Sequence, residues 1–522
     1  MLFAPDYYRI HLFHLMGERV KGRDALLPLR RAFQIDGDPK HMYLIAAIIL
    51  LSIVLIARIA SKWRVPLVVI ALATGVIFGS GVTGLIYFDD AVMARQIADF
   101  ALIFVLFIGG FGTRYERLKT VFASSMTLAT VGVALTALLT GVSLVVFLNY
   151  GLVMAFLIGC IISSTDAAAV FSILRSRSLN KRLSSLVEIE SATNDPMAIV
   201  LTTLAVRLIV ARMEHPLGMG LTLFWNLIIG IAIGLLVGKL GVFLFHQVKV
   251  LDRGYFYIFL VGLIMFSFGL ADVAGASGMI SAFFAGFFMG NSDIPYKKTI
   301  STLLEAISTI ANVIIFVILG LLVFPRDLLV VYREGIALFL IITFFSRPLS
   351  VLICTTFTKF NYKDRLFISW SGLRGAVPIV LATYPLAAGI PNSRVIFNMV
   401  FFAVVLSLLV QGSTITKMAD LLKLTVKTKP KPSQVMELAT LHKSDLELVE
   451  IQIDEDVYSG LVRVDSLRLP KGTVITMINR KDEIIAPHGS TVIKPSDVLY
   501  VLVRSTYIDH VTAKIMDNFE LK

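Results

Sequence analysis

Apolar runs of about 20 residues recur along this chain between residues 42 and 418. A helix of that length crosses the roughly 30 Å hydrocarbon core of a bilayer. Because backbone groups in lipid must pair within the segment, continuous runs form helices, whereas a membrane barrel would show alternating strands. The whole chain is 57% hydrophobic and only 16% charged. The sequence therefore predicts an all-α polytopic membrane protein.

The loop charges predict how the helices are oriented. We expect about 13 transmembrane helices, and the loops after the odd-numbered ones are basic, as in residues 175–182 and 359–365. The loops after even-numbered helices contain Asp89, Asp90 and Asp272 instead. Basic loops stay in the cytoplasm, which explains the net charge of +12 without nucleic acid as a partner. The chain should lie in the inner (plasma) membrane with its C-terminus in the cytoplasm.

Composition divides the chain into four parts. Residues 1–41 form a basic N-terminal extension that conflicts with an external start of the first helix. Our hypothesis is that translation starts at Met42; the alternative is an amphipathic helix that stays inside, with one span miscounted. Residues 42–420 form the transmembrane domain, and residues 421–444 form a basic linker that contains proline. Residues 445–522 show short alternating runs separated by turn signals, which predict a small α+β cytosolic domain.

Four of the predicted spans contain polar or ionisable groups. At the centre of a membrane such a charge costs roughly 2.5–3.5 kcal/mol, so its presence indicates function. The groups are Ser163, Ser164, Thr165 and Asp166 in the span at 152–174, Glu190, Ser191, Asn194 and Asp195 in the span at 183–205, Arg347 in the span at 334–358, and Arg374 in the span at 365–388.

The second of these groups occupies one face of a helix. Glu190 with Asn194, and Ser191 with Asp195, are spaced four residues apart, so each pair shares a stripe of the helix surface. A rise of about 1.5 Å per residue places Asp195 roughly 18 Å into the membrane. Pro196 cannot donate to the carbonyl four residues earlier, which leaves that oxygen free for water or an ion.

These residue types favour a hydrated cation site. Carboxylate, hydroxyl and carbonyl oxygens suit hard cations and protons, and Asp166 and Asp195 each lie beside such groups. The alternative is an inert pair, in which Glu190 forms a buried salt bridge with Arg347 or Arg374 that only holds helices together.

Two of the spans are interrupted in a way that is typical of inverted repeats. The span at 152–174 is broken by its polar run, and the span at 365–388 is broken by glycines and a proline. Broken helices in corresponding positions mark secondary transporters, and these two would cross if spans 1–6 and 8–13 were inverted copies. Half-helix ends leave partial charges, which Asp166 would offset at the positive ends and Arg374 at the negative ends.

Residues 42–418 resemble the monovalent cation/proton antiporters of the NhaP type. The resemblance rests on the motifs "SSTDAAAVFSILRSR", "ESATNDPMA", "SRP" and "SGLRGAVP". It implies that Asp195 alternately carries a cation, K⁺ or Na⁺, and a proton. Asp166, Thr165 and Ser191 would complete the cation site, Thr165 partly through its backbone.

The resemblance also implies how many charges move. Asn194 stands where electrogenic relatives have an aspartate, which indicates electroneutral, one-for-one exchange. Glu190 would pair with an arginine, and we favour Arg347. Family members are usually homodimers and work by an elevator-like movement of the core domain.

The C-terminal part resembles a TrkA-C (RCK C-terminal) domain. The resemblance rests on Gly460, "LRLPKG", Arg480 and "PHGSTVIKPSDVLYVLV". The "GGFG" at residues 109–112 lacks the strand–turn–helix context of a dinucleotide site, so we expect no cofactor. The domain could bind a small regulatory ligand, form a dimer contact, or act as a passive assembly module.

The sequence therefore predicts a secondary active transporter rather than an enzyme. Without a GxxxxGK[ST] motif it does not read as an ATP-driven pump. The alternatives are a cation channel, although no "TVGYG"-like filter is present, and an organic-anion symporter with a regulatory cytosolic domain.

Overall fold

The computed structural model divides the chain into two compact units. The described residues are 39–60, 67–166, 170, 178–211, 216–247, 253–426, 435–437, 446–453, 462–470, 472–480, 483–504 and 507–517. Residues 1–38 of the N-terminal extension, and 427–434 and 438–444 of the linker, lie outside them. The first unit ends at Leu424, and the second contains the rest of the chain together with the short segment around residues 178–180.

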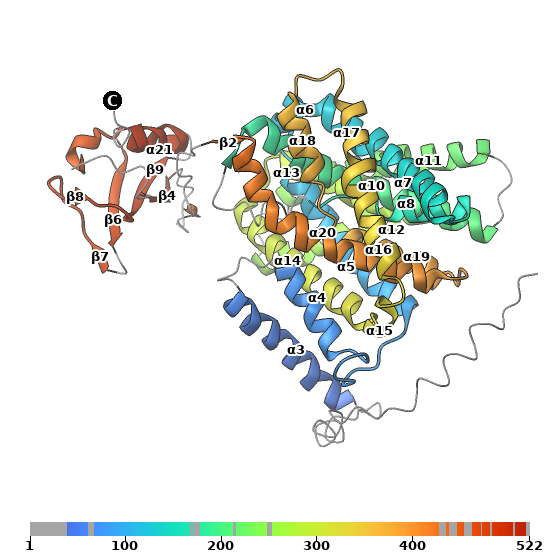
Figure 1. The fold of residues 1–522 in the computed structure, drawn as a ribbon. Helices are drawn as coiled ribbons and strands as arrows, with labels where there is room; N and C mark the ends of the chain where they lie inside the picture. The colour runs from blue at the N-terminus through green and yellow to red at the C-terminus, as the bar shows by residue number, and fades with distance from the viewer. Residues whose placement is uncertain are drawn as a thin grey trace, which may run out of the picture. The chain divides into compact units, whose positions relative to one another are not determined.

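The first unit is helical, as the apolar runs predict (Figure 1). Among the described residues, eight helices are long and apolar enough to span a membrane. They are α5 (Ala91–Gly112), α6–η3–α7 (Tyr115–Thr127, Leu128–Gly132, Val133–Leu148), α10 (Lys181–Ala211), α11 (Pro216–Gln247), α12 (Arg253–Val273), α14 (Lys297–Leu321), α16–η4–α17 (Tyr332–Ile341, Ile342–Ser346, Arg347–Thr355) and α20 (Ser393–Leu421).

Five other helices of this unit contain shorter apolar stretches: α3 (Pro39–Ala60, with its apolar stretch at Ala46–Arg58), α4 (Leu67–Phe78), α8 (Leu152–Ile161), α13 (Gly278–Asn291) and α19 (Ala376–Ala387). The two remaining helices are α15 (Pro325–Leu328) and α18 (Tyr362–Trp370).

Both predicted interruptions are present in the structure. After α8 ends at Ile161, Ser164 to Asp166 have no regular structure, and the chain is again irregular between α18 and α19. The two irregular segments meet, because the backbone N–H of Asp166 donates to the carbonyl of Leu373 at 2.7 Å. The two irregular segments are therefore in direct contact.

The helices pack as two groups. In one, α5 packs against α13 and α14, while α4 packs against α14 and α11 packs against α13. In the other, α10 packs against α6 and α8, and α20 packs against α16 and α19. The pair α5–α13 is closest at glycines: a Cβ added to Gly286 or Gly290 would meet the carbonyl oxygen of Phe107 or Phe111 respectively.

The second unit is a small domain of strands with one α-helix among its described residues. Five antiparallel strands follow the order β3 (Val435–Glu437), β4 (Leu446–Gln452), β9 (Val498–Arg504), β6 (Val474–Arg480) and β7 (Glu483–Ile485). A second, two-stranded sheet pairs β5 (Val462–Arg463) with β8 (Val492–Ile493). The helix α21 (Ile508–Asp517) contributes Val511 and Ile515 to the apolar core. The predicted strand-containing C-terminal domain is therefore confirmed.

A further strand pair links two distant parts of the sequence. The strand β1 (Ser178–Leu179) precedes α10, and β2 (Thr425–Val426) follows α20. They are antiparallel, with Leu179 opposite Thr425. The loop before α10 is therefore hydrogen-bonded to the first residues of the linker.

The glycine contact between α5 and α13 gives a prediction about stability. In Gly286→Ala the new methyl group would overlap the backbone of Phe107, so α5 and α13 must separate. Overpacking of this kind costs about 1–3 kcal/mol. We expect a lower thermal unfolding midpoint for the purified protein in detergent.

The matched control is Gly262→Ala in α12, where an added Cβ meets nothing within 4 Å. It should unfold at the same temperature as the parent protein or slightly higher, since alanine favours helix. Equal midpoints for both variants would contradict the close packing of α5 on α13.

Candidate functional site

A cavity of about 490 Å³ lies between the two helix groups, next to the irregular segments that follow α8 and precede α19. It is lined by parts of α4, α5, α10, α14 and α19 and by the irregular segments next to α8 and α19. Its polar lining includes Thr165, Asp166, Ser191 and Asp195, four of the residues that the sequence predicts for a cation site. Glu188 also lines the cavity, where its carboxylate accepts from Arg117 at 3.2 Å in an exposed ion pair.

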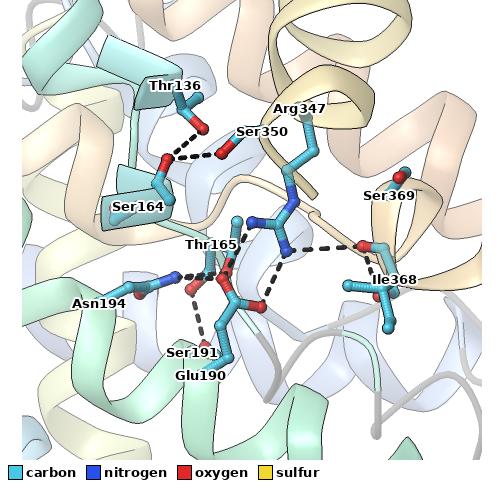
Figure 2. A network of polar contacts seen from close by, with 12 residues as sticks. Thr136, Ser164, Thr165, Glu190, Ser191, Asn194, Arg347, Ser350, Ile368 and Ser369 are labelled. Carbon is cyan, nitrogen blue, oxygen red and sulfur yellow. Dashed lines mark hydrogen bonds and ion pairs between the residues drawn. The ribbon is translucent and has the colours of Figure 1, made fainter. Parts of the chain in front are cut away.

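The buried ion pair beside this cavity joins Glu190 to Arg347. The two guanidinium nitrogens Nη1 and Nη2 donate to Oε1 and Oε2 of Glu190 at 3.0 and 2.8 Å, as Figure 2 shows. Only 3% of the Arg347 side chain and 2% of the Glu190 side chain are exposed. Because both charged groups are out of water, each needs the other. Glu190 is thus bonded to Arg347, and no hydrogen bond or ion pair joins it to Arg374 among the described contacts.

The same carboxylate organises the residues around it (Figure 2). Asn194 donates from Nδ2 to Oε1 of Glu190 at 3.1 Å and to Oγ1 of Thr165 at 2.6 Å. Ser191 donates to the carbonyl oxygen of Thr165 at 2.7 Å. Thr165 is therefore fastened to α10 through both its side chain and its backbone. The helical spacing of Glu190, Ser191 and Asn194 is what lets one helix face make all these bonds.

Two π-helical turns, η3 and η4, are present in the helices near the ion pair, and η4 ends directly before Arg347. The carbonyl of Gly132 in η3 accepts from Thr136 at 2.7 Å and from Ser350 of α17 at 2.8 Å. Such turns leave backbone groups outside the regular helix pattern, and they are frequent at functional sites. Here one of them ties α17, which begins with Arg347, to the α6–η3–α7 helix.

Arg374 binds the irregular backbone that follows α8. Its Nη1 donates to the carbonyls of Ser163 and Ser164 at 2.7 and 2.6 Å, and its own N–H donates to Ser407 at 3.1 Å. Because lipid offers no hydrogen bonds, carbonyls outside a helix need a protein donor, and the guanidinium supplies it. The side chain is fully buried, at 2% exposure.

Asp166 lies at the opposite kind of helix end. Gly375 precedes the first residue of α19, and a Cβ added there would overlap the Asp166 carboxylate. The carboxylate therefore sits at the N-terminus of α19, where partial positive charge stabilises it. Only glycine leaves room for this approach.

The sequence analysis missed three parts of this site. Ser308 and Asn312 of α14 line the cavity, and their spacing of four residues within an apolar run was the available signal. The carbonyl of Leu373 and the Gly375 contact depend on the crossing geometry, which residue spacing does not specify.

Comparison with known proteins identifies the family of this chain. Residues 48–421 match the family model described as sodium/hydrogen exchanger, transmembrane, and residues 448–516 match the TrkA-C domain. The chain belongs to the sodium/hydrogen exchanger family, whose members are transporters rather than enzymes. This membership does not favour the channel and symporter alternatives.

Individual relatives are similar over most of the chain. The K(+)/H(+) antiporter NhaP2 of Shewanella oneidensis is 36% identical, over 90% of this chain and 82% of its own length. The K(+)/H(+) antiporter NhaP of Alkalimonas amylolytica is 32% identical, over 88% of this chain and 81% of its own. The solved structure of the sodium proton antiporter MjNhaP1 from Methanocaldococcus jannaschii matches with a TM-score of 0.65 at 25% identity, covering 73% of this chain and 99% of that one.

The Glu190–Arg347 pair predicts a specific pattern of stabilities. Glu190→Gln and Arg347→Gln each leave one buried charge without its partner, which costs about 3–5 kcal/mol. The double variant removes both charges, so its loss should be smaller than the sum of the two single losses. Thermal unfolding of the purified variants in detergent measures this coupling. Additive losses would show that the two side chains act independently.

Proposed function

We propose that this antiporter exchanges K⁺ or Na⁺ for protons, one for one, with Asp195 as the shared carrier. The observation that carries the proposal is the different surroundings of the three carboxylates at the site. Glu190 is committed to Arg347 by two charged hydrogen bonds, whereas Asp166 and Asp195 line the cavity. Asp166 in turn lies at the N-terminus of α19, which favours its charged form.

Competition for one carboxylate explains the coupling. Asp195 can hold a proton or a cation but not both, because either guest neutralises the same charge. Movement of an uncompensated charge through the low-dielectric region is costly, so the loaded states reorient and the empty one does not. Thr165, Ser191 and Asp166 supply further oxygens from the cavity wall for a hard monovalent cation.

Asn194 supports electroneutral exchange. Its amide donates to two acceptors, Glu190 and Thr165, and this role requires N–H groups. A carboxylate in its place would face Glu190 across about 3 Å without a donor. The site therefore favours one titratable carrier at positions 194 and 195, and so one proton for one cation.

We further propose the arrangement of the whole protein. Thirteen spans in two inverted sets, with the crossed helices at their centre, are consistent with the eight long and five shorter apolar helices. The transmembrane domain would comprise residues 42–420 and the cytosolic domain residues 445–522. The basic loops support a cytoplasmic C-terminus, and we propose that the protein lies in the plasma membrane. We propose a homodimer, with a small regulatory ligand on the TrkA-C domain.

The first functional prediction concerns the carrier. Asp195→Asn keeps the shape of the side chain but removes the charge, so it should abolish cation-dependent proton movement in everted vesicles. The matched control, Asp327→Asn, changes a carboxylate of α15 that lies outside the cavity and should leave exchange unchanged. A folded Asp195→Asn protein that exchanges normally would refute the assignment.

The second functional prediction concerns Asn194. Asn194→Asp should unfold at a lower temperature, because a second carboxylate repels Glu190 and loses both donated bonds. Asn194→Gln keeps the amide and serves as the control for side-chain size and charge. Exchange and unfolding by Asn194→Asp that match the parent protein would contradict the donor role.

A further inference from the structure

A second cavity, of about 240 Å³, lies at the other end of the helices that hold the carboxylates. It is lined by α5, α10, α11, α12, α13 and α19. Its wall contains two acids, Asp99 and Asp272, and two bases, Arg95 and Arg207. None of these residues belongs to the site described above.

Only a thin layer separates the two cavities. Along α10, the first cavity includes Asp195 and the second begins at Ile199, four residues or ~6 Å further on. Along α5, Leu102 lines the first cavity and Asp99 the second, three residues or ~4.5 Å apart. The layer between them includes Ala198, which is completely buried.

A polar contact bridges the two helix groups at this level. Tyr384 of α19 donates from its hydroxyl to Oδ1 of Asp99 in α5 at 2.7 Å. Arg95 donates from Nε to Oδ2 of Asp99 at 3.4 Å, and its guanidinium carbon lies 4.0 Å from the centre of the Tyr384 ring. Tyr384 is only 4% exposed.

The position of Tyr384 connects this contact to the carrier site. Tyr384 lies on α19, the half-helix whose N-terminus faces the Asp166 carboxylate. Arg95 and Asp99 lie on α5, which packs with α13 and α14 in the other helix group. A movement of α19 away from α5 would break this contact next to the layer that separates the second cavity from Asp195.

We propose that the second cavity is the far half of the ion pathway, and that Asp99, Tyr384 and Arg95 form the latch that closes it in this conformation. The inference rests on the proposed carrier role of Asp195, because it concerns access to that residue. When the latch opens, the Asp99 carboxylate loses the tyrosine and is exposed to the cavity, whose wall also holds Asp272, Arg95 and Arg207. These are positioning residues that act on which face of the membrane reaches the carrier.

The latch is tested by side-specific labelling of the full chain in sealed vesicles. The reporter is Ala198→Cys in the separating layer, probed with a membrane-impermeant maleimide added on the face toward which the second cavity lies. The native thiols Cys160 and Cys354 are buried, and the parent protein without the reporter gives their background. Tyr384→Phe removes one hydrogen bond, so labelling at position 198 should become about fivefold faster.

Two comparisons make the result decisive. Tyr332→Phe is the matched control, because the Tyr332 hydroxyl accepts from Arg333 and lies outside the cavity; it should leave labelling unchanged. A reporter in the first cavity, Asn312→Cys, probed from the opposite face, should not label faster in Tyr384→Phe. Faster labelling at both reporters would mean general loosening and would overturn the proposal.

A second reporter guards against failure of the first. If Ala198→Cys does not fold, Met197→Cys replaces it. Met197 also lies between Asp195 and Ile199 on α10, and it is 8% exposed. Equal labelling rates with and without Tyr384→Phe would overturn the latch. The carrier assignment is judged separately, since it fails only if Asp195→Asn still exchanges cations for protons.

Discussion

The structure depends on satisfying backbone groups at two helix breaks inside a membrane protein. Lipid offers no hydrogen bonds, so an interruption is tolerated only where protein groups replace the missing helix partners. Here each break supplies hydrogen-bond partners for the backbone of the other. The N–H of Asp166 donates to Leu373, and the Arg374 guanidinium binds the carbonyls of Ser163 and Ser164. Because these bonds hold irregular backbone in place, a polar cavity can exist between the helices.

The charged side chains at the site also need partners, as the backbone groups do. Three charges at the site have fixed partners: Glu190 has Arg347, Arg374 has the carbonyls that follow α8, and Asp166 has the N-terminus of α19. Partnered charges are stable and do not need to exchange ligands. Asp195 lines the cavity and is the carboxylate for which we propose a changing partner. In this account the inert salt bridge and the ion site are neighbours in one network rather than competing interpretations.

Much of this architecture could be predicted from the sequence, because long apolar runs indicate membrane helices. The broken spans were visible as the polar run at Ser163–Asp166 and as the glycines around Arg374. The crossing itself was harder, since the Asp166–Leu373 bond joins segments about two hundred residues apart and depends on tertiary packing. The contact between Tyr384 and Asp99 could not be predicted, because Tyr384 lies in an apolar run and nothing in the sequence connects it with Asp99.

The central claim is that proton and cation compete for Asp195, and proton release measures this directly. Purified protein in weakly buffered detergent is mixed with KCl or NaCl, and a pH dye counts the protons displaced. Our account predicts about one proton per chain at saturating cation, and none in Asp195→Asn. Cation binding without proton release, or equal release from the folded Asp195→Asn variant, would contradict it.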